Sequence, residues 1–197
     1  MRVISLLDGK FEVACKNLYE IISDNYNPDV VIGVLTGGGY VGKELMKGFT
    51  NSKIIYTETK VQRSNTKQKE SGFLQKVLQM LPYFLLNWLR MAEMTFEDMM
   101  AKKTTPKREG NIEMSEDVDC LLKGKPQNIL LVDDAIDTGA TLKLIKDTLT
   151  NKYPLATIKT AVITVTSKNP LIDADFCIYH DRTLIRCPWS NDVKRKK

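Results

Sequence analysis

The sequence has few of the residues that build metal or disulfide sites. Its 197 residues contain a single histidine, His180, and four cysteines that form no C-x-x-C pair. The cysteines are Cys15, Cys120, Cys177 and Cys187. A structural zinc site needs cysteine and histidine ligands at close, regular spacing, so this distribution argues against one. Scattered cysteines are typical of free thiols that pack as small apolar groups.

The chain also lacks a long apolar run. Near its start, Asp8, Lys10 and Glu12 interrupt the opening stretch before it can form the apolar core of a secretory signal. The most apolar region, residues 73–100, is broken by Pro82 and by charges short of the roughly 20 apolar residues that a membrane span needs. We therefore expect a cytoplasmic protein with no membrane association.

The chain has only a small excess of positive over negative side chains. The formal net charge is +5, and the concentrated basic run is the tail at residues 194–197. Basic tails are usually solvated, so charge alone predicts no nucleic-acid partner. A chain of 197 residues with 43% hydrophobic residues can bury one sizeable core. We expect residues 1–197 to form a single domain.

Hydrophobic periodicity alternates between helical and extended patterns. Helical spacing of apolar residues predicts helices at residues 11–24, 40–49 and 141–153. Continuous β-branched runs predict buried strands at residues 30–35, 53–57, 128–132, 160–166 and 176–179. This order predicts an α/β fold with a mostly parallel sheet and helices on both faces. In such sheets, ligands bind at the carboxyl ends of the strands.

One region exceeds a minimal α/β domain. Residues 70–110 are predicted to be a helical insertion within the domain, because the apolar segment 73–100 lies between polar runs. Its large side chains, including Phe84 and Trp88, fall close to one helical face and would leave a large exposed patch. The patch must cover the flank of the sheet, a second copy of the chain, or another protein.

The strongest chemical signal is a buried strand followed by acids and a turn that opens a helix. The segment is Ile129-Leu-Leu-Val-Asp133-Asp134-Ala-Ile-Asp137-Thr138-Gly139-Ala140-Thr141. Adjacent carboxylates repel one another unless cations or hydroxyl donors meet them. Backbone amides at a helix start, assisted by threonine hydroxyls, form a cradle for a phosphate. A simple capped turn explains Thr138 and Gly139 but not Asp133 and Asp134, so the segment predicts a ribose 5-phosphate site.

This segment resembles the 5-phosphoribosyl-1-pyrophosphate motif of type I phosphoribosyltransferases. The resemblance implies the fold of that family, with a small C-terminal hood. It implies that Asp133 and Asp134 face the ribose hydroxyls directly or through Mg²⁺, the expected cofactor. Residues 137–141 would hold the 5-phosphate, and Asp137 would act as the general base.

A second resemblance lies at the end of the first predicted core strand, in Leu35-Thr36-Gly37-Gly38. The family keeps its pyrophosphate loop here, often with a non-proline cis peptide, and glycines let backbone amides approach the diphosphate. Thr36 stands where the family usually has a basic residue. The loss of one charge-assisted hydrogen bond costs about 1.5–3 kcal/mol. Lys43 and the basic loop at residues 60–69 are candidate sources of the missing charge.

A third resemblance covers residues 161–189 and is closest to the 6-oxopurine branch, in particular bacterial xanthine-guanine phosphoribosyltransferases. In that branch the chain closes on the pattern Thr-Trp-Ile-x-x-Pro-Trp. Its matching residues here are Thr183, Ile185, Pro188 and Trp189. The resemblance implies that Lys168 donates to the purine 6-oxygen and that Ile185 offers backbone groups to the base. Leu184 stands where the branch places an aromatic ring over the base. A solvent-facing lysine is the other interpretation of Lys168.

Two functions follow from these resemblances. The first is transfer of ribose 5-phosphate from phosphoribosyl pyrophosphate to a 6-oxopurine or similar base, as in purine salvage, by a homodimer of the kind the family forms. The loop at residues 60–69 would then close over the pyrophosphate, although a solvated basic loop is the alternative. The second is non-catalytic, regulatory binding of phosphoribosyl pyrophosphate or a nucleotide. Asp137 favours the first, whereas Thr36, Leu184 and the insertion favour the second.

Overall fold

The computed structural model describes residues 2–50, 53–61, 127–180, 182–190 and 193, together with residues 85, 92, 112, 113 and 122. Most of the predicted insertion at 70–110, most of the predicted loop at 60–69, and the basic tail lie outside the described residues. The elements are β1 (Arg2–Ser5), α1 (Lys10–Ser23), β2 (Val30–Val34), α2 (Gly37–Met46), β3 (Ile55–Val61), β4 (Ile112–Glu113), β5 (Asn128–Ile136), α6 (Ala140–Lys152), β6 (Thr157–Val165), β7 (Phe176–Tyr179) and β8 (Thr183–Arg186).

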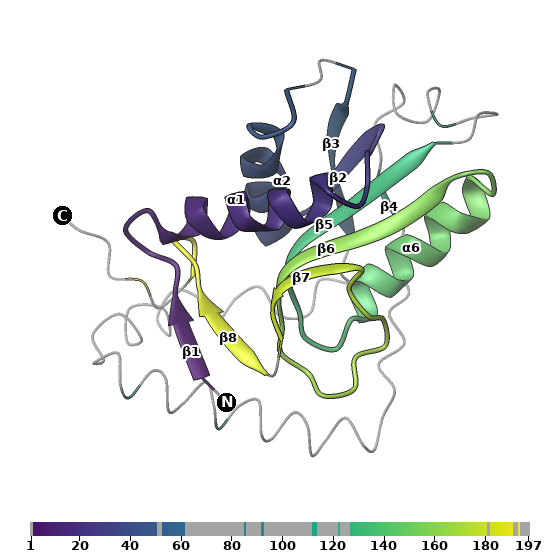
Figure 1. Cartoon of the computed structure of the whole chain (residues 1–197). Helices are drawn as coiled ribbons and strands as arrows, with labels where there is room; N and C mark the ends of the chain where they lie inside the picture. Colours follow the sequence, from purple (N-terminus) through teal and green to yellow (C-terminus); the bar gives the residue numbers. More distant parts are fainter. Residues whose placement is uncertain are drawn as a thin grey trace.

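The central sheet has the strand order β4-β3-β2-β5-β6-β7 (Figure 1). All neighbouring pairs from β3 to β7 are parallel, and only the short β4 pairs antiparallel, at the β3 edge. The predicted α/β fold with a mostly parallel sheet is therefore confirmed. Because parallel strands end at one edge of the sheet, the segments after β2, β5 and β6 meet there.

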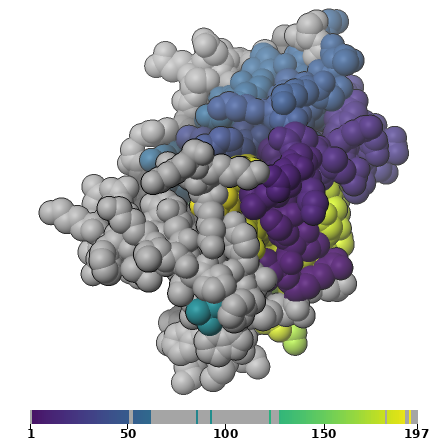
Figure 2. All heavy atoms as spheres, turned by 90° about the vertical axis from the view of Figure 1, so that its left-hand side faces the viewer, coloured from purple at the N-terminus to yellow at the C-terminus, as the bar shows by residue number. Residues whose placement is uncertain are grey.

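Helices cover both faces of the sheet, as predicted. Helices α1 and α2 pack on one face, where Val31, Leu130 and Ile163 belong to their core cluster. Helix α6 packs on the other face, over Ile32 and Leu131. Figure 1 shows these two helical layers, and Figure 2 shows α1, in purple, at the surface of one face of the molecule. Among the described helices, none is long and apolar enough to cross a membrane.

A separate two-stranded sheet forms the hood. Strand β1 pairs in parallel with β8, in a register that places Val3 beside Leu184 and Ile4 beside Ile185. The resemblance implied a C-terminal hood, but β1 was not predicted, because four residues are too few for a clear period-2 pattern. The first and last described strands therefore lie side by side.

Two boundaries differ from prediction in ways that matter for the site. Strand β5 continues to Ile136, so Asp133 and Asp134 lie within the strand rather than after it. The extension is stabilised by β6, which pairs Val162 with Asp133 and Val165 with Ile136. Helix α2 begins at Gly37 instead of residue 40. The predicted strand at 53–57 is β3, which begins at Ile55 and runs to Val61.

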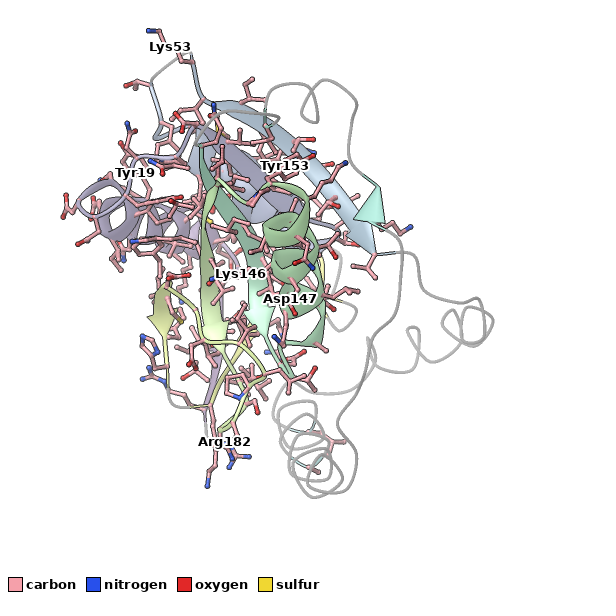
Figure 3. The ribbon with its side chains drawn as sticks, turned by 90° about the vertical axis from the view of Figure 1, so that its right-hand side faces the viewer. Tyr19, Lys53, Lys146, Asp147, Tyr153 and Arg182 are labelled. Carbon is pink, nitrogen blue, oxygen red and sulfur yellow. The ribbon has the colours of Figure 1, made fainter. Side chains whose placement is uncertain are left out.

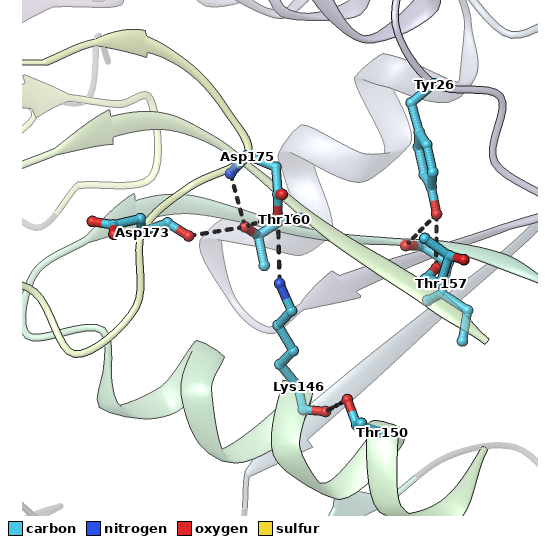
Figure 4. A network of polar contacts seen from close by, with 8 residues as sticks. Tyr26, Lys146, Thr150, Thr157, Thr160, Asp173 and Asp175 are labelled. Atoms are coloured by element: carbon cyan, nitrogen blue, oxygen red, sulfur yellow. Dashed lines mark hydrogen bonds and ion pairs between the residues drawn. The ribbon is translucent and has the colours of Figure 1, made fainter. Parts of the chain in front are cut away.

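A polar network ties β7 to the rest of the sheet (Figure 4). The backbone N–H of Thr160 donates to Asp175 Oδ2 at 2.8 Å, and the Thr160 hydroxyl lies 2.9 Å from the same oxygen. Lys146 of α6 reaches this carboxylate at 3.5 Å. Thr160 is fully buried, so its polar groups need these partners. The network holds the chain that follows β6 against the sheet and α6.

Candidate functional site

A cavity of about 210 Å³ opens at the carboxyl ends of β2 and β5. One side is formed by residues 34–37, at the turn from β2 into α2, and the other by residues 133–142, from the end of β5 into α6. Leu35, Thr36 and Gly37 of the predicted pyrophosphate loop therefore face the acids and the predicted phosphate turn. Parallel pairing of β2 with β5 brings together two segments that are far apart in the sequence.

The start of α2 approaches β5 closely enough to require glycine. A Cβ atom at Gly37 would overlap the carboxylate of Asp134. At Gly38 it would lie 2.7 Å from the Cα of Asp133, inside contact distance. Gly38 is buried beneath this contact and does not line the cavity. The peptide bond between Leu35 and Thr36 is cis, at the point where the resemblance implies one.

The paired acids are half-buried and hydrogen-bonded. The backbone N–H of Asp134 donates to Asp133 Oδ1 at 2.9 Å, and the indole N–H of Trp189 donates to Asp134 Oδ2 at 3.2 Å. Burial raises the pKa of Asp133 well above its ordinary value, and the charge of Asp134 adds to the rise. Burial also raises the pKa of Asp134, against the opposing effect of the Trp189 hydrogen bond. Both carboxylates would thus gain from a cation beside them.

The predicted phosphate turn runs into the first turn of α6. Gly139 has a φ of 76°, a left-handed conformation that glycine adopts without strain. The Leu171 N–H donates to the Thr138 carbonyl at 2.9 Å, which anchors the turn to the chain after β6. Ala140 and Thr141 line the cavity at the start of the helix. The first N–H groups of a helix lack intrahelical acceptors, so this turn can bind an anion.

Asp137 lies at the cavity with its side chain exposed. Its Oδ1 accepts a hydrogen bond of 2.6 Å from the hydroxyl of Thr166. Thr166 follows β6 and is 3% exposed, and its N–H donates to the Ile136 carbonyl at 2.9 Å. Sequence reasoning missed Thr166, because a threonine at a strand end is an ordinary β-residue.

Asp133 and Asp134 suit Mg²⁺, which takes few protein ligands, better than a metal ion whose ligands all come from the protein. Within the described ranges, no group of three or more His, Cys, Asp or Glu side chains could hold a metal ion. Mg²⁺ is commonly bound by one or two carboxylates, with water and substrate phosphate oxygens as its other ligands. Asp133 and Asp134 meet that requirement. No lysine or arginine stands among the described residues that line the cavity, which leaves three acids facing it.

The residues predicted to bind a base are not in this lining. Lys168 lines a second cavity of about 530 Å³, together with Ser167, Asp173, His180 and Arg182. Figure 3 shows Arg182 at the end of the molecule where β5 and β6 end, opposite Lys53. The second cavity is therefore at the same end of the sheet as the first.

The other predicted base contacts lie in the hood. Leu184 and Ile185 pair with β1, and neither residue lines either cavity. Ile185 is 9% exposed and belongs to the core on the α1 face. The structure thus gathers the predicted sugar-phosphate residues in one cavity and leaves the predicted base residues divided between a second cavity and the hood.

Lys43 is engaged away from the first cavity. Its ammonium group lies 2.9 Å from Glu58 Oε1, which also accepts a 2.9 Å hydrogen bond from the Tyr56 hydroxyl. The hydrogen bond from Lys43 lowers the pKa of Glu58, and burial partly opposes this effect. The candidate role of Lys43 as a substitute for the missing basic residue therefore lacks support in the geometry.

Comparison with models of protein families identifies one family. Residues 5–183 match the family described as "Phosphoribosyl transferase domain". A search of curated protein sequences found no significant match. Among solved structures, a purine phosphoribosyltransferase from Pyrococcus horikoshii is similar, with a TM-score of 0.58 and 20% identity, over 96% of this chain and 95% of that chain.

Two further solved structures have the same fold. A Helicobacter pylori xanthine-guanine-hypoxanthine phosphoribosyltransferase has a TM-score of 0.59 and 13% identity, over 94% of this chain and 92% of that chain. A hypothetical protein from Neisseria gonorrhoeae with bound ppGpp has a TM-score of 0.58 and 15% identity, over 95% of this chain and 89% of that chain. At these identities the likeness establishes the fold.

Proposed function

Because this chain belongs to the phosphoribosyl transferase domain family, as its sequence predicted, we propose that it transfers ribose 5-phosphate from phosphoribosyl pyrophosphate to a 6-oxopurine or similar base. Pyrophosphate is the second product. The observation that carries this proposal is the first cavity, which gathers Asp133 and Asp134, the turn at residues 137–141 and the loop at residues 35–37 around one space. These three groups of residues match the three parts of phosphoribosyl pyrophosphate: the ribose diol, the 5-phosphate monoester and the diphosphate.

Each part of the cavity has a task in this reaction. The turn at residues 137–141 binds the 5-phosphate through the first amides of α6 and its hydroxyl side chains. Asp133 and Asp134 accept hydrogen bonds from the ribose hydroxyls or hold Mg²⁺. Mg²⁺ held by these carboxylates would supply positive charge beside the diphosphate. The fixed orientation of the sugar against an incoming base supplies much of the rate enhancement.

Asp137 is the proposed general base. Thr166 donates to its Oδ1, and among the described residues no donor engages Oδ2. Oδ2 is therefore the oxygen that takes a proton from the ring nitrogen of the base as the bond to the ribose C1 forms. The exposed position of Asp137 at the cavity lets an acceptor reach it.

The proposed acceptor class is supported by Lys168 and by the names of the similar structures. An ammonium group donates hydrogen bonds and suits the 6-oxygen of hypoxanthine, guanine or xanthine, whereas adenine carries a donor at that position. Lys168 lines the second cavity at the same end of the sheet. The similar structures from Pyrococcus horikoshii and Helicobacter pylori are named as phosphoribosyltransferases of purines, and this supports the same class here.

The test is a screen for release of pyrophosphate. Purified protein is mixed with Mg²⁺, phosphoribosyl pyrophosphate and one base at a time: hypoxanthine, guanine, xanthine, adenine or uracil. We expect turnover with at least one 6-oxopurine and little with adenine. Equal or better use of adenine or uracil would contradict the acceptor assignment, and no turnover with any base would contradict transfer itself.

A second candidate function is regulatory binding of phosphoribosyl pyrophosphate or a nucleotide without catalysis. It is favoured by the described lining of the first cavity, which contains three acids and no lysine or arginine. It is also compatible with the Neisseria gonorrhoeae structure, which is described as holding ppGpp. Binding of phosphoribosyl pyrophosphate in calorimetry, with no pyrophosphate release for any base, would favour this candidate.

We further propose that the protein is a cytoplasmic homodimer, a single domain whose insertion at residues 70–110 supplies the self-association surface. The apolar face of residues 73–100 supports this proposal, although most of that face lies outside the described residues. The double substitution Phe84→Ser and Trp88→Ser should give a folded monomer by light scattering. A folded variant that keeps the wild-type mass would contradict it.

A further inference from the structure

Trp189 contacts the site from a distant part of the chain. It follows β8, and its indole N–H donates to Asp134 Oδ2 at 3.2 Å. Nothing in the proposed chemistry assigns it a task. A half-buried indole N–H needs one acceptor, yet its acceptor here is one of the two carboxylates that would hold the ribose or Mg²⁺.

The indole ring is held by two other aromatic rings. It stacks on Tyr40 of α2, with centroids 4.5 Å apart and an interplanar angle of 17°. The ring of Phe11 meets the indole ring of Trp189 edge to face, with ring centroids 5.0 Å apart and an interplanar angle of 90°. Aromatic pairs of both kinds stabilise a defined relative orientation. Helices α1 and α2 therefore fix the direction in which the N–H points.

Helix α2 confines the carboxylate of Asp134 on a second side. The first turn of α2 comes so close that a Cβ at Gly37 would overlap the carboxylate. Asp134 thus lies between the backbone of Gly37 and the indole of Trp189. A carboxylate confined in this way keeps one orientation, which is the property that a group binding a metal or a sugar hydroxyl needs.

We propose that Trp189 is a positioning residue for Asp134, with Tyr40 and Phe11 as its supports. Trp189 orients the carboxylate toward Mg²⁺ and the ribose hydroxyls, and it couples the chain after the hood to binding of the donor. This inference deepens the proposed function and rests on it for the identity of the ligand. The hydrogen bond itself is independent of that identity.

Trp189 also packs against the core, so the variant must separate orientation from packing. Trp189→Phe keeps an aromatic ring for the contacts with Tyr40 and Phe11 and removes the N–H. Tyr40→Phe is the matched control, because it keeps the stacked ring and the indole donor. Thermal unfolding of both variants reports whether the fold is retained.

The first measurement is calorimetric binding of phosphoribosyl pyrophosphate with Mg²⁺, in the absence of a base. Partners that orient metal-binding groups typically contribute about 10- to 100-fold in affinity. We expect a loss of that size for Trp189→Phe and an affinity within about twofold of wild type for Tyr40→Phe. A folded Trp189→Phe variant with wild-type affinity would overturn the inference. Failure of the wild-type protein to bind would instead contradict the proposed function.

The second measurement tests the hydrogen bond without any ligand. The sequence has two tryptophans, Trp88 and Trp189, so a ¹⁵N–¹H spectrum contains two indole signals. Trp88→Phe assigns the Trp189 signal by elimination, even where Trp189→Phe fails to fold. We expect Asp134→Ala to move the Trp189 signal upfield in ¹H and Asp137→Asn to leave it in place. A signal unmoved by Asp134→Ala would refute the positioning role.

Discussion

The hydroxyl of Thr166 donates a 2.6 Å hydrogen bond to Oδ1 of Asp137. It joins the end of β6 to the turn that follows β5, and Thr166 is itself buried and fixed by its N–H contact with the carbonyl of Ile136. The orientation of the proposed general base is therefore set by the neighbouring strand and not only by its own turn.

Removal of this hydroxyl should slow turnover with little effect on donor binding. Thr166→Val keeps the shape of the side chain and loses the donor. A hydrogen bond to a charged group contributes about 1.5–3 kcal/mol, so we expect kcat to fall by at least about tenfold while KM for phosphoribosyl pyrophosphate stays near wild type. Thr166→Ser retains the hydroxyl and should recover most of the rate. Equal kcat for the wild type and Thr166→Val would contradict this role.

Asp137→Asn should be more severe, because it removes the proposed base itself. We expect turnover to fall by roughly two to four decades, in the range of general-base catalysis, with binding of phosphoribosyl pyrophosphate largely intact. Steady-state kinetics and calorimetry on the same preparation separate the two effects. Turnover within about a factor of three of wild type would show that another group takes the proton.

A basic residue at position 36 should strengthen binding of the diphosphate. The described lining of the first cavity contains no lysine or arginine, and Thr36 occupies the predicted pyrophosphate loop. Thr36→Arg adds a charge-assisted hydrogen bond of about 1.5–3 kcal/mol. We expect pyrophosphate to bind about one to two decades more tightly, as measured by calorimetry.

Lys43→Ala is the matched control for the substitution at position 36. Lys43 is paired with Glu58 and its side chain is 63% exposed, so its removal should change pyrophosphate affinity little. A large loss of pyrophosphate affinity in Lys43→Ala would show that Lys43 supplies the positive charge that Thr36 lacks. No gain of pyrophosphate affinity in Thr36→Arg would show that another group already supplies it.

Burial of Cys15 predicts a loss of stability at high pH. Burial raises the pKa of its thiol from 9.0 to about 12, with Glu44 and Glu12 adding to the rise. The unfolded thiol ionises near its ordinary pKa while the folded thiol stays neutral. Its contribution is therefore complete below about pH 9 and is lost as the pH rises toward about 12.

The comparison that isolates this thiol is Cys15→Ala against wild type. The variant is less stable at neutral pH because it loses buried volume. Between about pH 8 and about pH 10.5, however, its free energy of unfolding should fall less than that of the wild type. Chemical denaturation at several pH values measures both curves. Parallel curves would refute the proposed pKa shift.

The sheet could be predicted from the sequence because its strands are continuous β-branched runs, but the two boundaries that matter for the site, the end of β5 and the start of α2, could not. Glycine is a poor helix former, so the pattern placed the start of α2 after the glycines, whereas the close approach to β5 requires Gly37 and Gly38 inside the helix. Aspartate is similarly poor in strands, yet pairing with β6 holds Asp133 in β5. In both cases tertiary contacts override local propensity.

Most of the residues that line the first cavity could be predicted to lie at the site, because each group is contiguous in the sequence. The hydrogen bonds that orient Asp137 and Asp134 come from partners 29 and 55 residues away, so no local pattern could reveal Thr166 or Trp189 as their donors. Lys168 is predicted to contact the base, and its place in a second cavity depends on the path of the chain after β6.

The pairing of β1 with β8 sets an order of events during synthesis. Arg2 Nε–H donates to Thr183 Oγ1 across 181 residues, so β1 is made long before its partner strand β8. Trp189 emerges later still. A nascent chain can thus assemble β2, β5 and the predicted pyrophosphate loop before the indole N–H that donates to Asp134 has been made. If Trp189 has the positioning role proposed above, binding of phosphoribosyl pyrophosphate would reach full strength only after the residues that follow β8 have been translated.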